Sequence, residues 1–156
     1  CTARTGNPGG LEQAGYVLVF ILEGEGCTQL GPILVGEEAG DQFGRSVALS
    51  SSGRRVAIGA VAAIAGGGEG RGRIYVYDYS DSADDWFPKG QYLDGINNKD
   101  WQGTSVDLSS DGNILAIGSD GHDTSGSNAG MVRVYELVDS LWVQYGNSFY
   151  GEAESD

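Results

Sequence analysis

The loop around the single histidine holds the side chains that come nearest to catalysis or metal binding. His122 lies in the segment Asp120-Gly-His-Asp-Thr-Ser-Gly126. A catalytic histidine needs a nucleophile and an orienting partner, and the sequence suggests neither nearby, so we expect a solvated loop histidine and no enzyme. Asp120 and Asp123 carry oxygen ligands of the kind that calcium takes, and they are our candidate metal ligands. The alternative, which we favour, is that both carboxylates bond to the backbone of their own turn.

A second set of acidic residues recurs along the chain. Asp41 and Asp100 stand three residues before Gly44 and Gly103, and Asp156 ends a similar segment. Recurrence in each unit favours a structural role, in which the carboxylate braces a turn through side-chain-to-backbone hydrogen bonds. The alternative is a recurring calcium ligand. Glutamates that would assist it are Glu37, Glu38, Glu152 and Glu154.

The composition excludes two classes of partner. The chain has 22 acidic and 9 basic residues and a formal net charge of −13. Nucleic-acid binding needs clustered lysine and arginine, so no nucleic-acid partner is expected. The sequence also has no apolar stretch near the roughly 20 residues that span a bilayer, so no membrane insertion is expected. The negative charge suits solubility, calcium-rich surroundings or a cationic partner.

The elements that position these residues repeat every 57 to 59 positions. Similar apolar runs begin at Gly15, Gly72 and Gly130, and a second pair of similar runs begins at Gly44 and Gly103. A period of this length marks an array of small supersecondary units, none of which buries its apolar face alone. The approximate units are 1–41, 42–100 and 101–156.

Each unit has the pattern of four antiparallel strands. In the best-defined unit the expected strands are 105–109, 114–118, 131–135 and 142–145. Asp111-Gly112 joins the first two, because glycine accepts the positive φ of a tight hairpin. No segment sustains a 3.6-residue apolar period, so little or no helix is expected. The sequence predicts an all-β fold of about two and a half to three β-propeller blades.

The strings that carry this pattern resemble a known repeat. They are Phe43-Gly-Arg-Ser-Val-Ala-Leu-Ser50, Val56-Ala-Ile-Gly-Ala60 and Gly72-Arg-Ile-Tyr-Val-Tyr77. Together they resemble the FG-GAP repeat, which builds the seven-bladed propeller of integrin α-subunits and many secreted repeat proteins. The resemblance implies propeller blades and an extracellular or cell-surface location.

The hairpins depart from the calcium-binding versions of this family. Those versions place Asp-x-Asp-x-Asp-Gly between the first two strands. Here the hairpins read Ser51-Ser-Gly-Arg54 and Ser110-Asp-Gly-Asn113, with at most one carboxylate. Calcium takes six to eight oxygen ligands, so neither hairpin is expected to hold the ion alone.

The aromatic positions are expected to serve packing. Phe43 of the Phe-Gly pair becomes Gln102 in the next unit, where we expect the preceding Trp101 to fill the gap. Trp86 and Trp142 recur at matching positions and are expected to pack between neighbouring sheets. Some of the tyrosines could instead line a sugar-binding face, and alternation along the strands leaves this open; they are Tyr75, Tyr77, Tyr79 and Tyr135.

The two cysteines are too few for a disulfide scaffold. Cys1 opens the loop that leads into the strand starting near Gly15, and Cys27 follows the far end of that strand. The two strand ends are about 25 Å apart, whereas a disulfide needs Cα atoms within about 7 Å. We therefore expect no intrachain bridge, with Cys27 packed and Cys1 free or bonded to another chain.

The three units are about one 18-residue hairpin short of three complete blades. Propellers close with four to eight blades, so this array is expected to be open. Either it continues in a longer chain or copies complete one another through free strand edges.

These observations predict an extracellular structural or adhesive repeat module that acts through strand-edge and blade-face contacts. Its partner is expected to be protein, through self-association, as in a filament, or through neighbouring repeats of a longer chain. No cofactor is expected. The alternative is a propeller module that binds a glycan or protein, with calcium dependence. The fold alone does not choose between the two.

Overall fold

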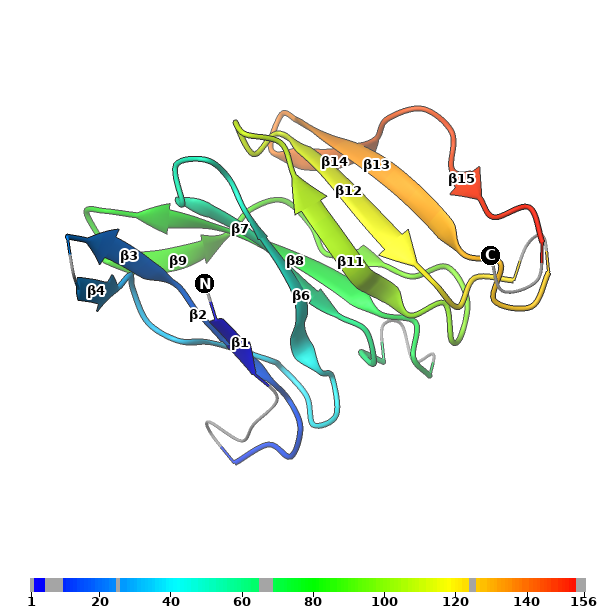
Figure 1. Ribbon diagram of the computed structural model, residues 1–156, viewed down its shortest axis with the longest axis horizontal. Helices are drawn as coiled ribbons and strands as arrows, with labels where there is room; N and C mark the ends of the chain where they lie inside the picture. The colour runs from blue at the N-terminus through cyan, green and yellow to red at the C-terminus, as the bar shows by residue number, and fades with distance from the viewer. Residues whose placement is uncertain (1, 5–9, 25, 65–68, 124–125, 154–156) are drawn as a thin grey trace.

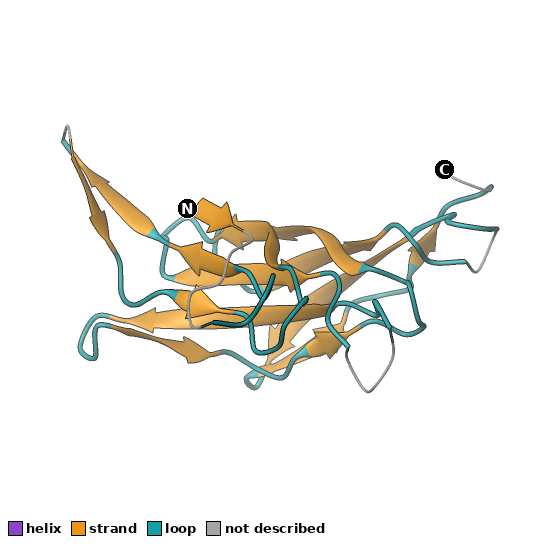
Figure 2. Cartoon of the chain, turned by 90° about the horizontal axis from the view of Figure 1, so that it is seen from below, coloured by secondary structure: helices purple, strands orange, loops and turns teal. Residues whose placement is uncertain are grey.

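The chain forms four antiparallel sheets, two of five strands, one of three and one of two, and these make up three blades that stand side by side (Figure 1). The three-stranded and the two-stranded sheet together form the first blade. The computed structural model describes residues 2–4, 10–24, 26–64, 69–123 and 126–153, and fifteen strands and no helix occur within these ranges. The predicted all-β fold of antiparallel blades is therefore confirmed. Seen from below, the strands of the neighbouring sheets lie in layers (Figure 2).

The second blade shows the complete unit. Its strands are β6 (Phe43–Leu49), β7 (Arg55–Ala60), β8 (Arg73–Ser80), β9 (Asp85–Pro88) and β10 (Leu93–Asp94). The order in the sheet is β6, β7, β8, and both β9 and β10 pair with the outer edge of the long strand β8. The short outer strands therefore share one position, which gives a sheet four strands wide.

The third blade repeats this arrangement strand for strand. Its strands are β11 (Gln102–Leu108), β12 (Ile114–Ser119), β13 (Met131–Val138), β14 (Leu141–Gln144) and β15 (Phe149–Tyr150). Here β14 and β15 both pair with β13. The register is also the same, since Phe149 faces Val132 as Leu93 faces Ile74.

The first blade consists of the later strands of the same unit. Its strands are β1 (Thr2–Arg4), β2 (Tyr16–Leu18), β3 (Phe20–Glu23), β4 (Gly26–Gln29) and β5 (Leu34–Val35). In register, Ala3 faces Val17 as Gly59 faces Ile74, so β1 takes the place of the second strand. The described part of the first blade has no strand equivalent to β6 or β11.

The Phe43-Gly44 pair and its equivalent, Gln102-Gly103, make a bulge at the start of β6 and of β11. We call these two the innermost strands, because each lies at the edge of its sheet opposite the short outer strands. Gly44 has φ 88° and Gly103 has φ 94°, and the pairing of β6 with β7 and of β11 with β12 shifts register at these positions. A β-carbon on Gly103 would lie 2.7 Å from Ile74 Cδ1 of the second blade. Glycine is therefore required both by the positive φ and by the close approach of two blades.

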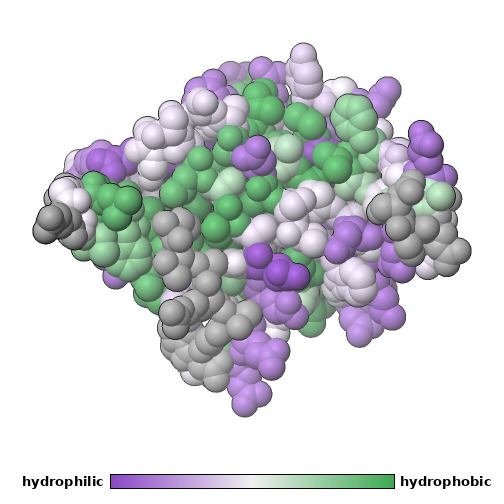
Figure 3. All heavy atoms as spheres, in the orientation of Figure 1, coloured by the Kyte–Doolittle hydropathy of each residue, from purple (hydrophilic) through white to green (hydrophobic). Residues whose placement is uncertain are grey.

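Two apolar cores lie between the blades. The first is formed by the first and second blades and includes Val17, Val19, Leu30, Phe43, Val56, Ile58, Tyr75 and Trp86. The second is formed by the second and third blades and includes Ala57, Ile74, Val76, Leu93, Leu115, Ile117, Tyr135 and Trp142. On the face shown in Figure 3, apolar residues gather over the middle of the molecule. Each blade is thus stabilised mainly by the blade next to it.

Candidate functional site

The recurring aspartates lie buried at the turns where one blade passes to the next. The carboxylate of Asp41 accepts a hydrogen bond from the backbone N–H of Glu38 at 3.1 Å. Asp100 accepts two, from Ile96 at 3.0 Å and from Asn97 at 2.8 Å. Both side chains brace the turn that precedes the innermost strand. Asp156 and Glu154 lie outside the described residues.

Burial raises the pKa of Asp41 above its usual value, and this gives a pH-dependence with a definite sign. A raised pKa in the folded state means that folding favours the protonated carboxyl. The resulting contribution of Asp41 to stability is present below the ordinary pKa near 3.9 and is lost as pH rises through the raised value. Asp41→Asn keeps an acceptor for Glu38 without the buried charge. We expect this variant to gain stability relative to the parent as pH rises from about 3.5 to 7.

Urea unfolding at several pH values tests this expectation, and Asp111→Asn is the matched control. The exposed Asp111 accepts hydrogen bonds from Ser109 and Asn113, which lower its pKa, so its contribution is lost as pH falls. The two variants should therefore change in opposite directions with pH. A loss of stability in Asp41→Asn that is the same at every pH would contradict the expected role of burial.

His122 is a buried residue, and the expectation of a solvated loop histidine is wrong. Its Nδ1 lies 2.9 Å from Oδ1 of Asp100, which is itself buried. The ring also stacks on Tyr150, with centroids 5.7 Å apart. The histidine therefore ties its loop to the turn braced by Asp100 and to the outer strand β15. In the second blade Ala63 stands at the equivalent position, so this tie belongs to the third blade alone among the described blades.

The two candidate metal ligands of the same loop hold different partners. Oδ1 of Asp120 accepts a hydrogen bond from the Thr104 hydroxyl at 2.7 Å. Oδ1 of Asp123 accepts one from the backbone N–H of Asn128 at 2.7 Å. Across the part of the chain that the structure describes, no group of three or more His, Cys, Asp or Glu residues is arranged to hold a metal ion. A calcium site here stays a prediction.

The hairpin oxygens of the third blade are engaged by an arginine of the second blade. Arg55 donates from Nη1 to the carbonyl of Gly112 and to Oδ1 of Asn113, each at 2.9 Å. Its Nη2 donates to Asp78 at 2.8 Å. The Arg55 guanidinium thus lies beside this hairpin and joins the two blades.

Gln102 is a buried residue, and the expectation that Trp101 fills its gap is wrong. The Gln102 amide donates to the carbonyl of Leu93 at 2.6 Å and accepts from the guanidinium of Arg133. Trp101 is 42% exposed. In the second blade the same two positions hold Phe43 and Tyr75, whose rings meet edge to face at 5.1 Å. An aromatic pair in one blade is therefore replaced by a polar pair in the next.

The tyrosines considered for a sugar-binding face lie largely between blades. Tyr75 and Tyr135 are buried in the two cores. Tyr77 and Tyr79 are partly buried and pack against the first core. Burial raises the pKa of Tyr75, Tyr77 and Tyr135, with desolvation the largest cause. These rings therefore contribute to blade packing.

The tryptophans of the second and third blades are each inserted into the preceding blade. Trp86 of β9 donates from Nε1 to the carbonyl of Leu30 in the first blade at 3.1 Å. A β-carbon on the adjacent Gly31 would lie 2.9 Å from the same nitrogen. Trp142 of β14 repeats the contact, since it donates to the carbonyl of Lys89 at 2.9 Å and covers Gly90.

The innermost strand makes a second recurring joint. Phe43 donates its backbone N–H to Ala14 at 2.9 Å, and Gln102 donates to Arg71 at 3.1 Å. A β-carbon on Gly72 would lie 2.1 Å from the carbonyl oxygen of Gln102. Each joint between blades therefore has two parts, a seat for the tryptophan and a seat for the start of the innermost strand.

On the outer side of the third blade, neither the tryptophan seat nor the strand seat is occupied by a described residue of another blade. Among the described residues, no atom lies within 4 Å of a β-carbon built on Gly146, the equivalent of Gly31 and Gly90. Only distant backbone atoms, 3.7 Å away or more, lie near one built on Gly130, the equivalent of Gly72. We call the surface that includes Gly130, Val132, Gly146 and Phe149 the open face.

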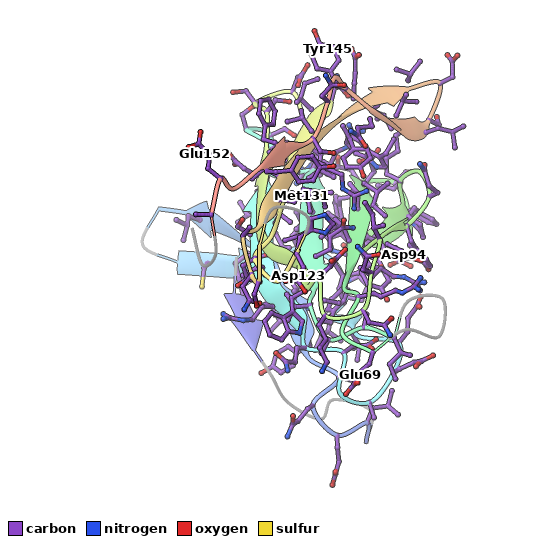
Figure 4. All side chains as sticks on the ribbon, turned by 90° about the vertical axis from the view of Figure 1, so that its right-hand side faces the viewer. Glu69, Asp94, Asp123, Met131, Tyr145 and Glu152 are labelled. Atoms are coloured by element: carbon purple, nitrogen blue, oxygen red, sulfur yellow. The ribbon has the colours of Figure 1, made fainter. Side chains whose placement is uncertain are left out.

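Residues of the open face are exposed at positions whose equivalents are buried between blades elsewhere in the chain. Val17 and Ile74 are both 0% exposed, whereas Val132 at the same position is 43% exposed. Leu93 is 7% exposed and its counterpart Phe149 is 64% exposed. Figure 4 looks onto this side of the molecule, where Tyr145, which precedes Gly146, projects at the top and Met131 lies near the centre.

A groove of about 380 Å³ on the open face corresponds to the strand seat. Its lining includes Gly118, Ala129, Gly130 and Val132. The equivalents of these residues in the second blade are Gly59, Arg71, Gly72 and Ile74, and they receive Gln102 and Gly103. The groove therefore lies where the innermost strand of a following blade would pack.

The first blade has a cysteine in place of the tryptophan, and the expectation that Cys27 packs is wrong. Cys27 occupies the second position of β4, where β9 and β14 have tryptophan. It is exposed and is a free thiol. No described blade precedes the first, so this side chain has no neighbour to pack against. Cys1 lies outside the described residues.

The fold and its joints define a repeat protein made of propeller-type blades. Residues 36–77 match the FG-GAP repeat, from the turn braced by Asp41 to the middle of β8. The chain thus contains an FG-GAP repeat, and the resemblance drawn from its strings is confirmed. A sequence search of curated proteins finds no match to the chain. In the described residues, no helix is long and apolar enough to cross a membrane.

Proposed function

We propose that this chain is a structural and adhesive module of the cell exterior, which acts by stacking blade faces against neighbouring repeats. The observation that carries the proposal is the open face. Its residues match, position by position, those that are buried at the two joints within the chain, yet Val132 and Phe149 are exposed. Apolar surface of this kind is stabilised when a second blade covers it.

The charge and the family support the same function. The net charge of −13 disfavours non-specific association of exposed strands and apolar residues, and so favours a specific blade contact. The family resemblance favours an extracellular or cell-surface setting. Antibody labelling of intact source cells tests this part, since an internal protein would be labelled only after permeabilisation.

An extended chain tests the stacking itself. A second copy of residues 101–156 is joined after Asp156, so that the junction reproduces the Asp100–Trp101 step. We expect the added blade to cover Val132. The substitution Val132→Asp should then cost about 3–5 kcal/mol in the extended chain, because it buries an unpaired charge. In the 156-residue chain it should cost about 1 kcal/mol, because the position is exposed on a strand.

Urea unfolding of the four proteins measures these costs. Glu136→Asp on the same strand is a control that keeps the charge and is expected to have equal, small effects in both chains. Equal costs of Val132→Asp in the two chains would mean that the added blade does not cover the face, and the proposed function would then be wrong.

A further inference from the structure

We infer that the open face accepts a particular kind of partner: a further blade, from outside residues 1–156, that has both a glycine-containing innermost strand and a tryptophan at the second position of its fourth strand. This inference rests on the proposed function and goes beyond it, because it names the groups that are recognised. It also excludes a second copy of this chain as the occupant.

The tryptophan seat is the first ground for the inference. At both filled joints the indole lies over a glycine of positive φ, at Gly31 with φ 66° and at Gly90 with φ 77°. Gly146 has φ 74°, and a β-carbon built on it would meet no atom of the described residues within 4 Å. The indole N–H bonds to the carbonyl of the residue before the glycine in both joints. On the open face that acceptor is the carbonyl of Tyr145.

The strand seat is the second ground, and it is independent of the first. At the second joint the bulge glycine Gly103 approaches Gly59, where a side chain on Gly59 would lie 2.3 Å from the Gly103 carbonyl oxygen. The hydroxyl of Ser46 also donates to this carbonyl at 2.7 Å. On the open face the equivalents are Gly118 and Ser105, and both line the groove together with Gly130.

A second copy of the chain lacks both groups in accessible form. Its Trp86 and Trp142 are already inserted into its own first and second blades. Its first blade, the one with a free side, has Cys27 at the tryptophan position and no innermost strand among the described residues. Association of identical copies through this face would leave both seats empty.

The test compares a crowded glycine with an uncrowded one in two chains. In the 156-residue chain, Gly146→Ala and Gly53→Ala should weaken folding equally, since both glycines have positive φ and open space. In the extended chain, Gly146→Ala should weaken folding about tenfold more than Gly53→Ala, because the methyl group meets the added indole. Replacing the added tryptophan with alanine should remove this difference.

Urea unfolding gives the equilibrium constants, and sedimentation equilibrium of the 156-residue chain completes the test. We expect a monomer at all concentrations. If Val132→Asp shows that the added blade covers the face, but Gly146→Ala and Gly53→Ala remain equivalent, the inference is wrong and the proposed function stands. If the 156-residue chain associates and Val132→Asp abolishes association, a second copy is the occupant and the inference is again wrong.

Discussion

Replacing Gln102 with phenylalanine is expected to destabilise the chain by about 3–5 kcal/mol, although phenylalanine occupies this position in the preceding blade. The reason is Arg133, which is buried and is paired with the Gln102 amide oxygen. Its other contacts are weaker, namely the Asp94 carbonyl at 3.4 Å and the face of Tyr135 at 5.6 Å. Phenylalanine would leave a buried guanidinium without its principal acceptor.

Adding Arg133→Tyr to Gln102→Phe is expected to recover at least half of this loss. The double variant recreates the pair formed by Phe43 and Tyr75 in the second blade, whose rings pack edge to face. Recovery should be incomplete, because the Leu93 carbonyl loses the hydrogen bond from Gln102 and a buried unpaired carbonyl costs about 1–3 kcal/mol.

Urea unfolding of the parent, both single variants and the double variant forms a complete double-mutant cycle. We expect a coupling of about 2 kcal/mol or more between the two positions. Additive effects would contradict the conclusion that each blade selects its residue at the Phe-Gly position together with the residue opposite it.

The second large effect is expected at Trp142. Trp142→Ala should destabilise the chain by about 3–5 kcal/mol, because it opens a cavity in the core between the second and third blades. It also removes the hydrogen bond from the indole to the Lys89 carbonyl. The Trp142 backbone makes two further hydrogen bonds with the Gln91 side chain, at 2.7 and 3.0 Å, and the indole no longer holds this backbone in place. These contacts join the fourth strand of the third blade to the second blade.

Trp101→Ala is the matched control, since this tryptophan lies in the same blade and is 42% exposed. Its loss should cost about 1 kcal/mol, because only part of the ring leaves a buried surface. Thermal or urea unfolding, followed by far-ultraviolet circular dichroism, compares the two variants without depending on tryptophan fluorescence. Similar losses for both would mean that the joint contributes little to stability.

Local features of the sequence were enough to predict the blades. Hairpin signals such as Asp111-Gly112 and the alternation in strands such as β13 act over a few residues, so they can be recognised without the neighbouring sheets. The repeated Phe43-Gly44 and Gln102-Gly103 pairs marked the start of each unit. They did so because the bulge needs a glycine wherever it occurs.

Positions that depend on the adjacent blade were not predictable in the same way. His122 lies in a polar loop, yet it is buried against Asp100, which is 22 residues away, and against Tyr150 of β15. The burial of Gln102 follows from Arg133 on β13, 31 residues away. Cys27 is exposed for the opposite reason, because the position that packs in the later blades has no described neighbour in the first.

The amino-acid sequence by itself determined the repeat, the strands and the all-β class, since these follow from backbone preferences and from alternation within short segments. The tertiary structure decided which faces are filled and which are open. That distinction depends on contacts between residues more than 50 positions apart, such as Trp86 with Leu30 and Trp142 with Lys89. The same glycine and apolar pattern is present in each unit, and the position of the unit in the array makes its surface buried or available.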